Sequence, residues 1–181
     1  MTNTKNIIAH VYKQYKWEET LVQNNGFFSL NLTKASVERI IDVLQFDKTT
    51  EEECVWIGCG DAREILAIAT LYPNIKFTTM DINKDAITVA KEKLRILGLK
   101  NVSILYKNAL KERKKYTHVY STALAGDELY QHLLKISKKN LCMLSRMWKK
   151  MEQNKFMNER KTQVCISGSG EKKTLIAKQL K

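Results

Sequence analysis

The sequence contains few of the residues that interrupt a folded chain. It has one proline and seven glycines in 181 residues, and 44% of the residues are hydrophobic. A chain of this length and composition can bury a substantial core. These numbers exclude a disordered or low-complexity chain and suit a compact globular fold.

Long apolar runs and paired cysteines are also missing. No stretch approaches the roughly 20 apolar residues of a membrane-spanning helix, and residues 1–19 lack the apolar segment of a secretory signal. The cysteines form no CxxC pair and no group with histidines at zinc-ligand spacing. We therefore expect reduced, buried thiols, no metal site and no membrane association, in a protein of the cytoplasm or nucleus. The cysteines are Cys54, Cys59, Cys142 and Cys165.

Negative charge is scarce, most of all near the end of the chain. The net charge is +12, and residues 134–181 carry eleven lysines and two arginines against three glutamates, an excess of ten positive charges. Such a segment can be an ordinary solvated surface or a face that binds phosphate or another acidic partner. The charge alone does not decide between the two.

Short apolar runs alternate with segments of helical periodicity. This alternation predicts βαβ units, and hence a mostly parallel sheet with helices on both faces. Asn83 is placed to cap a helix and Gly98 to end it, and GSGE at 168–171 predicts a final hairpin with an antiparallel last strand. The strands are expected at 53–58, 75–81, 101–106, 117–122, 140–145, 162–167 and 172–180, and the helices at 35–44, 63–72, 83–98, 127–139 and 149–161.

The stretch VWIGCGDAR, at 55–63, joins the first of these strands to a helix. Ligands of doubly wound sheets bind beyond the carboxyl ends of the strands, and Gly58 and Gly60 allow main chain to approach a ligand closely. Asp81 ends the next strand, 21 residues after Gly60, where a carboxylate can bind both hydroxyls of a ribose. Two simpler roles stay open, because the glycines can serve only a tight turn and Asp81 can cap the following helix.

Two nucleotide sites are disfavoured by missing residues. Arg63 stands where the third glycine of a dinucleotide-binding loop belongs, and neither GKS nor GKT of a P-loop occurs. The remaining combination of GxG, Asp81 and a final hairpin resembles the class I S-adenosylmethionine-dependent methyltransferases. The resemblance implies an α/β fold with a three-layer, seven-stranded, Rossmann-like sheet whose last strand is antiparallel. It covers residues 35–181, and residues 1–34 form an N-terminal extension packing on that domain.

The resemblance also implies roles for single residues. Asp81 holds the ribose, and Ile82 flanks the adenine. The loop lies under the methionine end of the cofactor, and the amide of Asn108 can contact the adenine amino group. The implied cofactor-binding residues are Gly58, Cys59, Gly60, Asp61, Arg63, Asp81, Ile82 and Asn108.

Two positions depart from the pattern of the family. Trp56 stands where an acid is usual, and Ala62 replaces the last glycine of the loop. Asp61 can supply an acid nearby, and Arg63 can pair with the carboxylate of the cofactor. Tyr120, Ser121 and Thr122, after the fourth strand, line the methyl-transfer end and are the implied catalytic residues.

The segment after the fourth strand bears on the methyl acceptor. STALAGD contains no proline, which disfavours transfer to base amino groups, and Cys142 has no proline beside it, which disfavours transfer to cytosine C5. The layout resembles the non-SET lysine methyltransferases of the disruptor-of-telomeric-silencing type, which favours a histone-type lysine. Phe27, Phe28, Tyr120 and Trp148 are then candidate walls of a lysine channel.

Two alternatives remain open. One is an RNA methyltransferase, and the other is a weakly active or inactive module that binds nucleic acid or a partner enzyme. In each case the basic residues of 134–181 can contact phosphates, either on nucleosomal DNA or on RNA.

Overall fold

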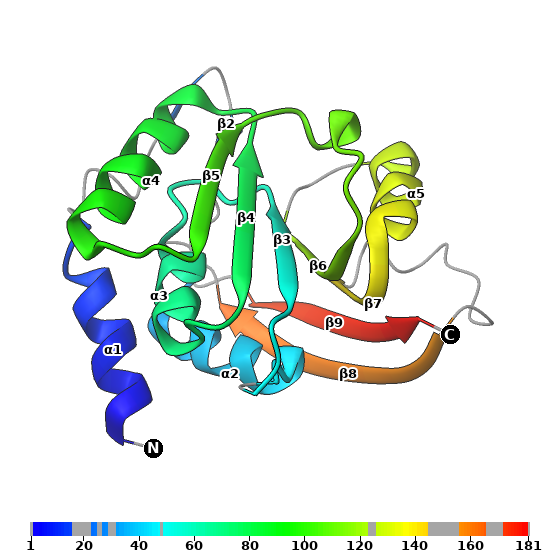
Figure 1. Ribbon diagram of the computed structural model, residues 1–181, viewed down its shortest axis with the longest axis horizontal. Helices are drawn as coiled ribbons and strands as arrows, with labels where there is room; N and C mark the ends of the chain where they lie inside the picture. Colours follow the sequence, from blue (N-terminus) through cyan, green and yellow to red (C-terminus); the bar gives the residue numbers. More distant parts are fainter. Residues whose placement is uncertain are drawn as a thin grey trace.

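The structure is a computed structural model that describes residues 2–15, 23–24, 27–28, 32–47, 49–122, 126–144, 156–165 and 172–180 (Figure 1). Its centre is a seven-stranded sheet with the order β5-β4-β3-β6-β7-β9-β8. The strands from β5 to β7 are parallel, and β9 runs antiparallel between β7 and β8. The expected α/β fold with an antiparallel last strand is therefore confirmed. The strands are β3 (Glu53–Ile57), β4 (Lys76–Asp81), β5 (Val102–Tyr106), β6 (Tyr116–Ser121), β7 (Ser137–Leu144), β8 (Phe156–Cys165) and β9 (Lys172–Leu180).

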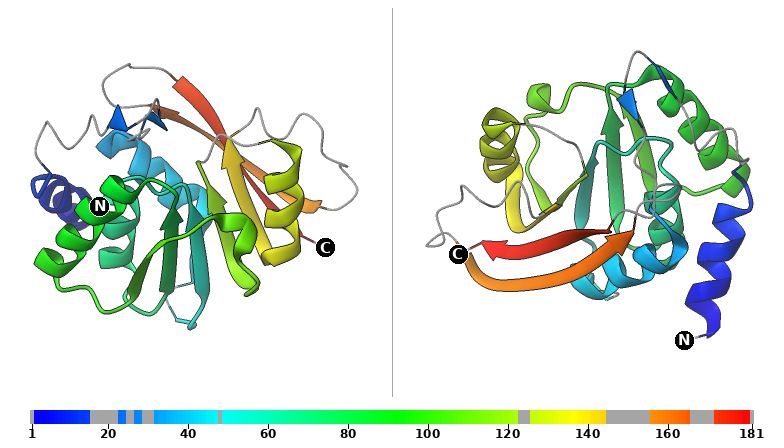
Figure 2. Two further views of the ribbon diagram at one scale, coloured as in Figure 1. Left: turned by 90° about the horizontal axis from the view of Figure 1, so that it is seen from above. Right: turned by 180° about the vertical axis from the view of Figure 1, so that it is seen from behind.

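Helices cover both faces of this sheet. The alternation of side chains along β3 divides the core, because Cys54 and Trp56 pack with residues of α1 to α4, whereas Val55 and Ile57 pack with residues of η2 and α5. Figures 1 and 2 show α4 and α5 on opposite sides of the molecule. The helices are α1 (Thr2–Tyr12), α2 (Lys34–Leu44), α3 (Arg63–Leu71), α4 (Lys84–Leu97), the 3₁₀-helix η2 (Ala109–Lys111) and α5 (Asp127–Ile136), and β1 (Gln23–Asn24) pairs with β2 (Phe27–Phe28) outside the main sheet.

The predicted caps of α4 are both present. Asn83 accepts hydrogen bonds from the main-chain N–H groups of Asp85 and Ala86 through its side chain, and Gly98 ends the helix in the left-handed conformation at φ 64°. These signals are local, since each needs only a few neighbouring residues. The limits of this helix therefore follow from the sequence.

The expected helix at 149–161 is wrong where the structure describes it. Residues 156–161 belong to β8, which pairs with β9 from Phe156 to Cys165 with one register shift between Phe156 and Asn158. The main-chain hydrogen bonds of that ladder override a local helical pattern, since propensity is a weak prior against tertiary pairing. The helix expected at 127–139 also ends early, at Ile136, because β7 begins at Ser137. The GSGE turn lies outside the described residues.

The N-terminal segment shares the main core. Ile8 and Val11 of α1 are almost fully buried in the cluster that contains α2 and α3, and the hydroxyl of Tyr12 donates to the carbonyl of Leu32 at 2.8 Å. The division at residue 34 stays a prediction, but residues 2–12 pack as part of the fold.

Two further expectations concern the thiols and the membrane. Cys54, Cys59 and Cys142 are buried, as predicted, and form no disulfide within the described residues, while the side chain of Cys165 lies outside them. Across the ranges that the structure describes, no helix has the length and apolar character needed to span a bilayer.

Candidate functional site

The loop after β3 is held against the end of β4. Gly58 and Gly60 take positive φ values of 73° and 53°, which favour glycine. The N–H of Gly58 donates to the carbonyl of Met80 at 2.9 Å, and the N–H of Gly60 donates to Oδ2 of Asp81 at 2.8 Å. Cys59 is buried between them, and burial raises the pKa of its thiol. The two glycines and Asp81, which are far apart in sequence, therefore form one unit.

Asp81 is half-buried and fixed at both oxygens. Oδ2 accepts from Gly60, and Oδ1 accepts from the N–H of Asn83 at 2.9 Å. A carboxylate oxygen can accept two hydrogen bonds, so each oxygen keeps one acceptor site for a ligand hydroxyl. The cap of α4 is Asn83 rather than Asp81. Asp81 is thus available for the predicted ribose contact.

Exposed apolar side chains lie beside this carboxylate. Ile82 is 56% exposed and Tyr106 is 60% exposed, and Tyr106 is the register partner of Asp81 on β5. Asn108 is exposed and accepts from the N–H of Leu110, which leaves its amide N–H groups and a second oxygen site for a ligand. An apolar surface next to a carboxylate and an amide suits a purine nucleoside. Tyr106 was missed from the sequence, although an aromatic residue that ends a strand beside the glycine loop is a usable signal.

The three residues predicted as catalytic lie in different surroundings. Thr122 is half-buried, and its hydroxyl donates to the carbonyl of Gly58 at 2.8 Å, so it supports the loop directly. Ser121 is fully buried at the end of β6. Tyr120 is also fully buried, with its ring centroid 3.6 Å from that of Trp56. The structure therefore places Tyr120 in the core, where no substrate reaches it, whereas Thr122 contacts the loop directly.

Trp56, the first departure from the family pattern, therefore packs in the core against Tyr120. The hydroxyl of Tyr120 has no hydrogen-bond partner among the described residues. We expect Tyr120→Phe to leave methyl transfer within about twofold of wild type. It should raise the free energy of unfolding by about 1 kcal/mol or more, since it removes an unsatisfied buried group. A large loss of turnover at unchanged stability would instead restore a catalytic role for Tyr120.

Asp61 and Arg63 face each other inside the protein. Their side chains are 0% and 4% exposed, Nε of Arg63 lies 3.0 Å from Oδ1 of Asp61, and Nη2 binds Oδ2. Tyr15 completes the cluster, because the arginine Cζ lies 4.6 Å from its ring centroid and its hydroxyl donates to the carbonyl of Asp61 at 3.0 Å. Both charged residues were predicted to bind a cofactor. The geometry gives them a structural role under the loop, and ligand contact stays a prediction.

Glu64 is a buried acid that the sequence reasoning missed. Its Oε1 accepts from the N–H of Leu32 at 2.6 Å, which ties α3 to the segment before α2. Burial, and next the charge of Asp61, raise the pKa of the Glu64 carboxyl from 4.5 to about 7. The available signal was a single acid in the mostly apolar helix REILAIATL.

The raised pKa makes the stability of the protein depend on pH. The carboxyl binds a proton more readily in the folded state, so the contribution of Glu64 to stability is fully present below about pH 4.5 and is lost as the pH rises to about 7. We expect Glu64→Gln to raise the free energy of unfolding by up to about 3 kcal/mol at pH 8 and to change it little at pH 4.5. Denaturant unfolding across this range measures the effect, with the exposed Glu51→Gln as the control. Equal gains at both pH values would contradict a titrating Glu64.

Ala62 is the second departure from the family pattern, where the last glycine of the loop is usual. It is the N-cap residue of α3 at φ 61°, where an alanine is strained, and it is fully buried. Glycine would relieve about 1–2 kcal/mol of strain but lose the burial of one methyl, about 0.8 kcal/mol. We expect Ala62→Gly to stabilise the protein by less than about 1 kcal/mol.

Gln45→Gly should stabilise the protein more than Ala62→Gly does, because Gln45 is exposed at φ 49° and its replacement loses no packing. Thermal unfolding of both variants compares them, and a destabilised Gln45→Gly would show the strain argument to be wrong.

No group of three or more potential metal ligands occurs within the part of the chain that the structure describes. The site therefore consists of a main-chain loop, one carboxylate and exposed apolar and amide side chains. It can bind and orient a nucleoside.

Comparisons with known proteins agree with this arrangement. A family model described as a methyltransferase domain matches residues 52–178. Ribosomal RNA small subunit methyltransferase G of Phocaeicola vulgatus is 31% identical over 104 residues, which are 56% of this chain and 46% of that protein. The protein of the same name from Bacteroides thetaiotaomicron is 29% identical over 123 residues, 68% of this chain and 53% of that protein. The chain thus spans about half the length of the curated relatives it matches.

Solved structures share the fold at low identity. Precorrin-6y C5,15-methyltransferase from Geobacter metallireducens superposes with a TM-score of 0.70 at 12% identity, over 91% of this chain and 96% of the other. Magnesium protoporphyrin IX methyltransferase from Synechocystis, solved with bound SAM, gives a TM-score of 0.66 at 14% identity, over 98% and 97% of the two chains.

Proposed function

Because this chain belongs to the methyltransferase-domain family, we propose that it is an S-adenosylmethionine-dependent methyltransferase whose acceptor is RNA. The observation that carries the proposal is the unit formed by Gly58, Gly60 and Asp81. It offers bare main chain and a fixed carboxylate at the carboxyl ends of β3 and β4. The family match over residues 52–178 supports it independently.

The residues of the site fit this cofactor. Asp81 would bind the ribose hydroxyls with the acceptor sites that Gly60 and Asn83 leave open. Ile82 and Tyr106 would cover the adenine, and Asn108 would contact its polar edge. When bound, the cofactor supplies an activated methyl group. The protein contributes orientation and exclusion of water, which are the main requirements of a direct displacement.

RNA now replaces lysine as the favoured acceptor. Both curated relatives bear the name of ribosomal RNA methyltransferases. Of the candidate walls of the lysine channel, Tyr120 is buried in the core, while Trp148 and the side chains of Phe27 and Phe28 lie outside the described residues. An RNA acceptor is also compatible with the expected intracellular location.

A methyl-transfer assay tests the proposal. Radiolabelled S-adenosylmethionine would be supplied with deproteinised ribosomal RNA, small ribosomal subunits or nucleosomes, using wild type and Asp81→Ala. We expect label in RNA with wild type alone. Label only in histones would show that the RNA acceptor is wrong. Cofactor binding without transfer to any substrate would favour the inactive-module alternative.

A further inference from the structure

A second basic region lies outside the C-terminal quarter. Residues 107–115, KNALKERKK, contain five basic residues and one acid. They connect β5 to β6 through η2, on the face of the sheet that α5 also covers. The segment starts at the proposed site, since the N–H of Lys107 donates to the carbonyl of Asp81 at 3.0 Å.

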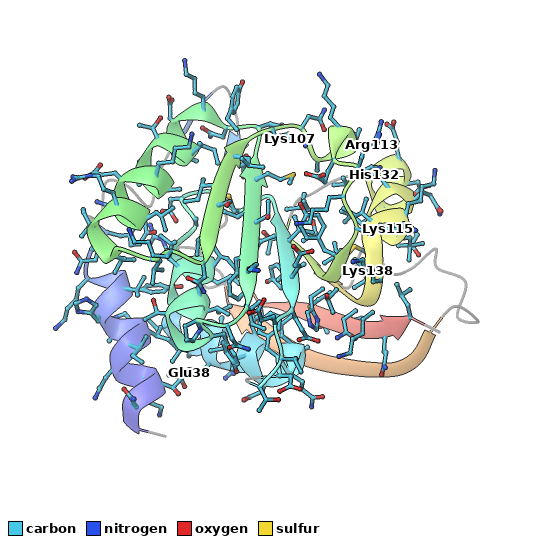
Figure 3. All side chains as sticks on the ribbon, viewed as in Figure 1. Glu38, Lys107, Arg113, Lys115, His132 and Lys138 are labelled. Carbon is cyan, nitrogen blue, oxygen red and sulfur yellow. The ribbon has the colours of Figure 1, made fainter. Side chains whose placement is uncertain are left out.

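The fold brings further basic residues to this segment. α5 packs against η2, and β6 pairs with β7 so that Tyr116 faces Ser137. That register places Lys115 and Lys138, which flank the pair, at the same end of the sheet. Figure 3 shows Arg113, Lys115 and Lys138 on one side of the molecule. We call the exposed residues Lys111, Arg113, Lys115, Lys135 and Lys138 the basic stripe.

Two of the acids near this stripe are paired with lysines outside it. Glu112 is buried and pairs with Lys107 at 3.0 Å, and Glu53 pairs with Lys114 at 2.6 Å. In the described portion of the chain, the four lysines of the stripe form no ion pair. Their charges are therefore available to a partner.

One member of the stripe is held in a fixed pose. Nη1 of Arg113 donates to the carbonyls of Leu110 at 2.8 Å and of Glu112 at 3.2 Å. These bonds leave the other guanidinium N–H groups to bind phosphate, at a reduced cost of ordering the side chain.

We propose that the basic stripe binds the phosphate backbone of the RNA and guides it to the site beside Asp81. This inference rests on the proposed function and adds the docking surface to it. A six-residue strand is about 20 Å long, so a stripe that runs from the carboxyl end of β5 to the start of β6 can contact several phosphates.

The character of the stripe favours a polyanion over an acidic protein. The exposed large apolar residues of the described chain are Ile82, Ile96, Leu105 and Tyr106, and none belongs to the stripe. Protein interfaces generally bury apolar and aromatic residues at their centre. Phosphate binding needs only charge and donors, which the stripe supplies.

A pair of charge-matched variants tests the stripe. The stripe variant carries Lys111→Gln, Lys115→Gln and Lys138→Gln. The control variant carries Lys84→Gln, Lys91→Gln and Lys100→Gln, three exposed lysines on or beside α4, on the other side of the molecule. Fluorescence anisotropy with a labelled ribosomal RNA fragment gives the affinity and its salt dependence for each protein.

We expect the stripe variant to bind RNA about tenfold or more weakly at low salt. Its plot of log affinity against log salt should be shallower by about 2, since each lost phosphate contact on a single strand removes about 0.7. The control variant should bind like wild type. Calorimetry with S-adenosylhomocysteine should give the same affinity for wild type and both variants. That result would show that the substitutions leave the cofactor site intact.

Three results would contradict the proposed binding of RNA phosphates by the basic stripe. Equal losses in both variants would mean that only total charge matters, and wild-type binding by the stripe variant would exclude a role for these lysines. Competition by polyglutamate as strong as by RNA would point to an acidic protein partner. A failure of the proposed function can be told apart from a failure of the stripe proposal. If only the proposed function is wrong, wild type methylates no RNA, but the stripe variant still binds RNA more weakly than wild type.

Discussion

Replacing Asp81 with alanine is expected to weaken the binding of S-adenosylhomocysteine by roughly 100-fold or more. Each hydrogen bond from a ligand hydroxyl to a buried or half-buried carboxylate contributes about 1.5–3 kcal/mol. Loss of two such bonds corresponds to about 3 kcal/mol or more, or two factors of ten in affinity. The variant also frees the N–H groups of Gly60 and Asn83, which shape the loop. Titration calorimetry measures the loss.

Asp85→Ala is the matched control, because Asp85 is an exposed acid four residues later in the first turn of α4. It should bind the ligand like wild type. Thermal unfolding of Asp81→Ala separates lost contacts from a lost fold. If the folded Asp81→Ala protein binds within threefold of wild type, the ribose contact proposed for this carboxylate is wrong.

Replacing Arg63 with methionine is expected to lower the free energy of unfolding by about 3–5 kcal/mol. The substitution removes the guanidinium that neutralises the fully buried Asp61, which lies close to Glu64, and removing one member of a buried ion pair is strongly destabilising. It also removes the cation that packs on the ring of Tyr15. Denaturant unfolding measures the change, and Arg95→Met, at an exposed arginine of α4, should change stability by less than about 0.5 kcal/mol.

A double variant separates the structural role of Arg63 from a role in ligand binding. Asp61→Asn combined with Arg63→Met removes both charges, so it should recover much of the stability lost in Arg63→Met. If Arg63 is structural, this variant should also bind S-adenosylhomocysteine with near wild-type affinity. Restored stability with lost binding would instead place Arg63 against the carboxylate of the cofactor.

The buried cluster links the N-terminal segment to the cofactor loop. Tyr15 contacts Asp61 and Arg63, and Glu64 holds the main chain at Leu32. Because these groups lie directly after Gly60, the packing of residues 2–15 influences the shape of the loop. This coupling explains why the side chains of Asp61 and Arg63 are buried in the interior.

Short-range patterns determined the elements on which the site is built. The alternation of apolar strands and amphipathic helices predicted the parallel sheet, and Asn83 and Gly98 marked the ends of α4. Gly58, Gly60 and Asp81 could be recognised because a turn after a strand and an acid at the end of the next strand meet at the same edge of a parallel sheet. Such signals depend on neighbouring residues and on a connectivity that the fold class already implies.

Tertiary structure decided everything that depends on partners distant in the sequence. Residues 156–161 form a strand because β9 offers a ladder, and Tyr120 lies in the core because Trp56 occupies the adjacent strand. Arg63 turns inward because Asp61 and Tyr15 meet it there, and the basic stripe exists because β6 and β7 pair in one register. A side chain's direction and its environment are set by packing between elements, and no local pattern encodes that packing.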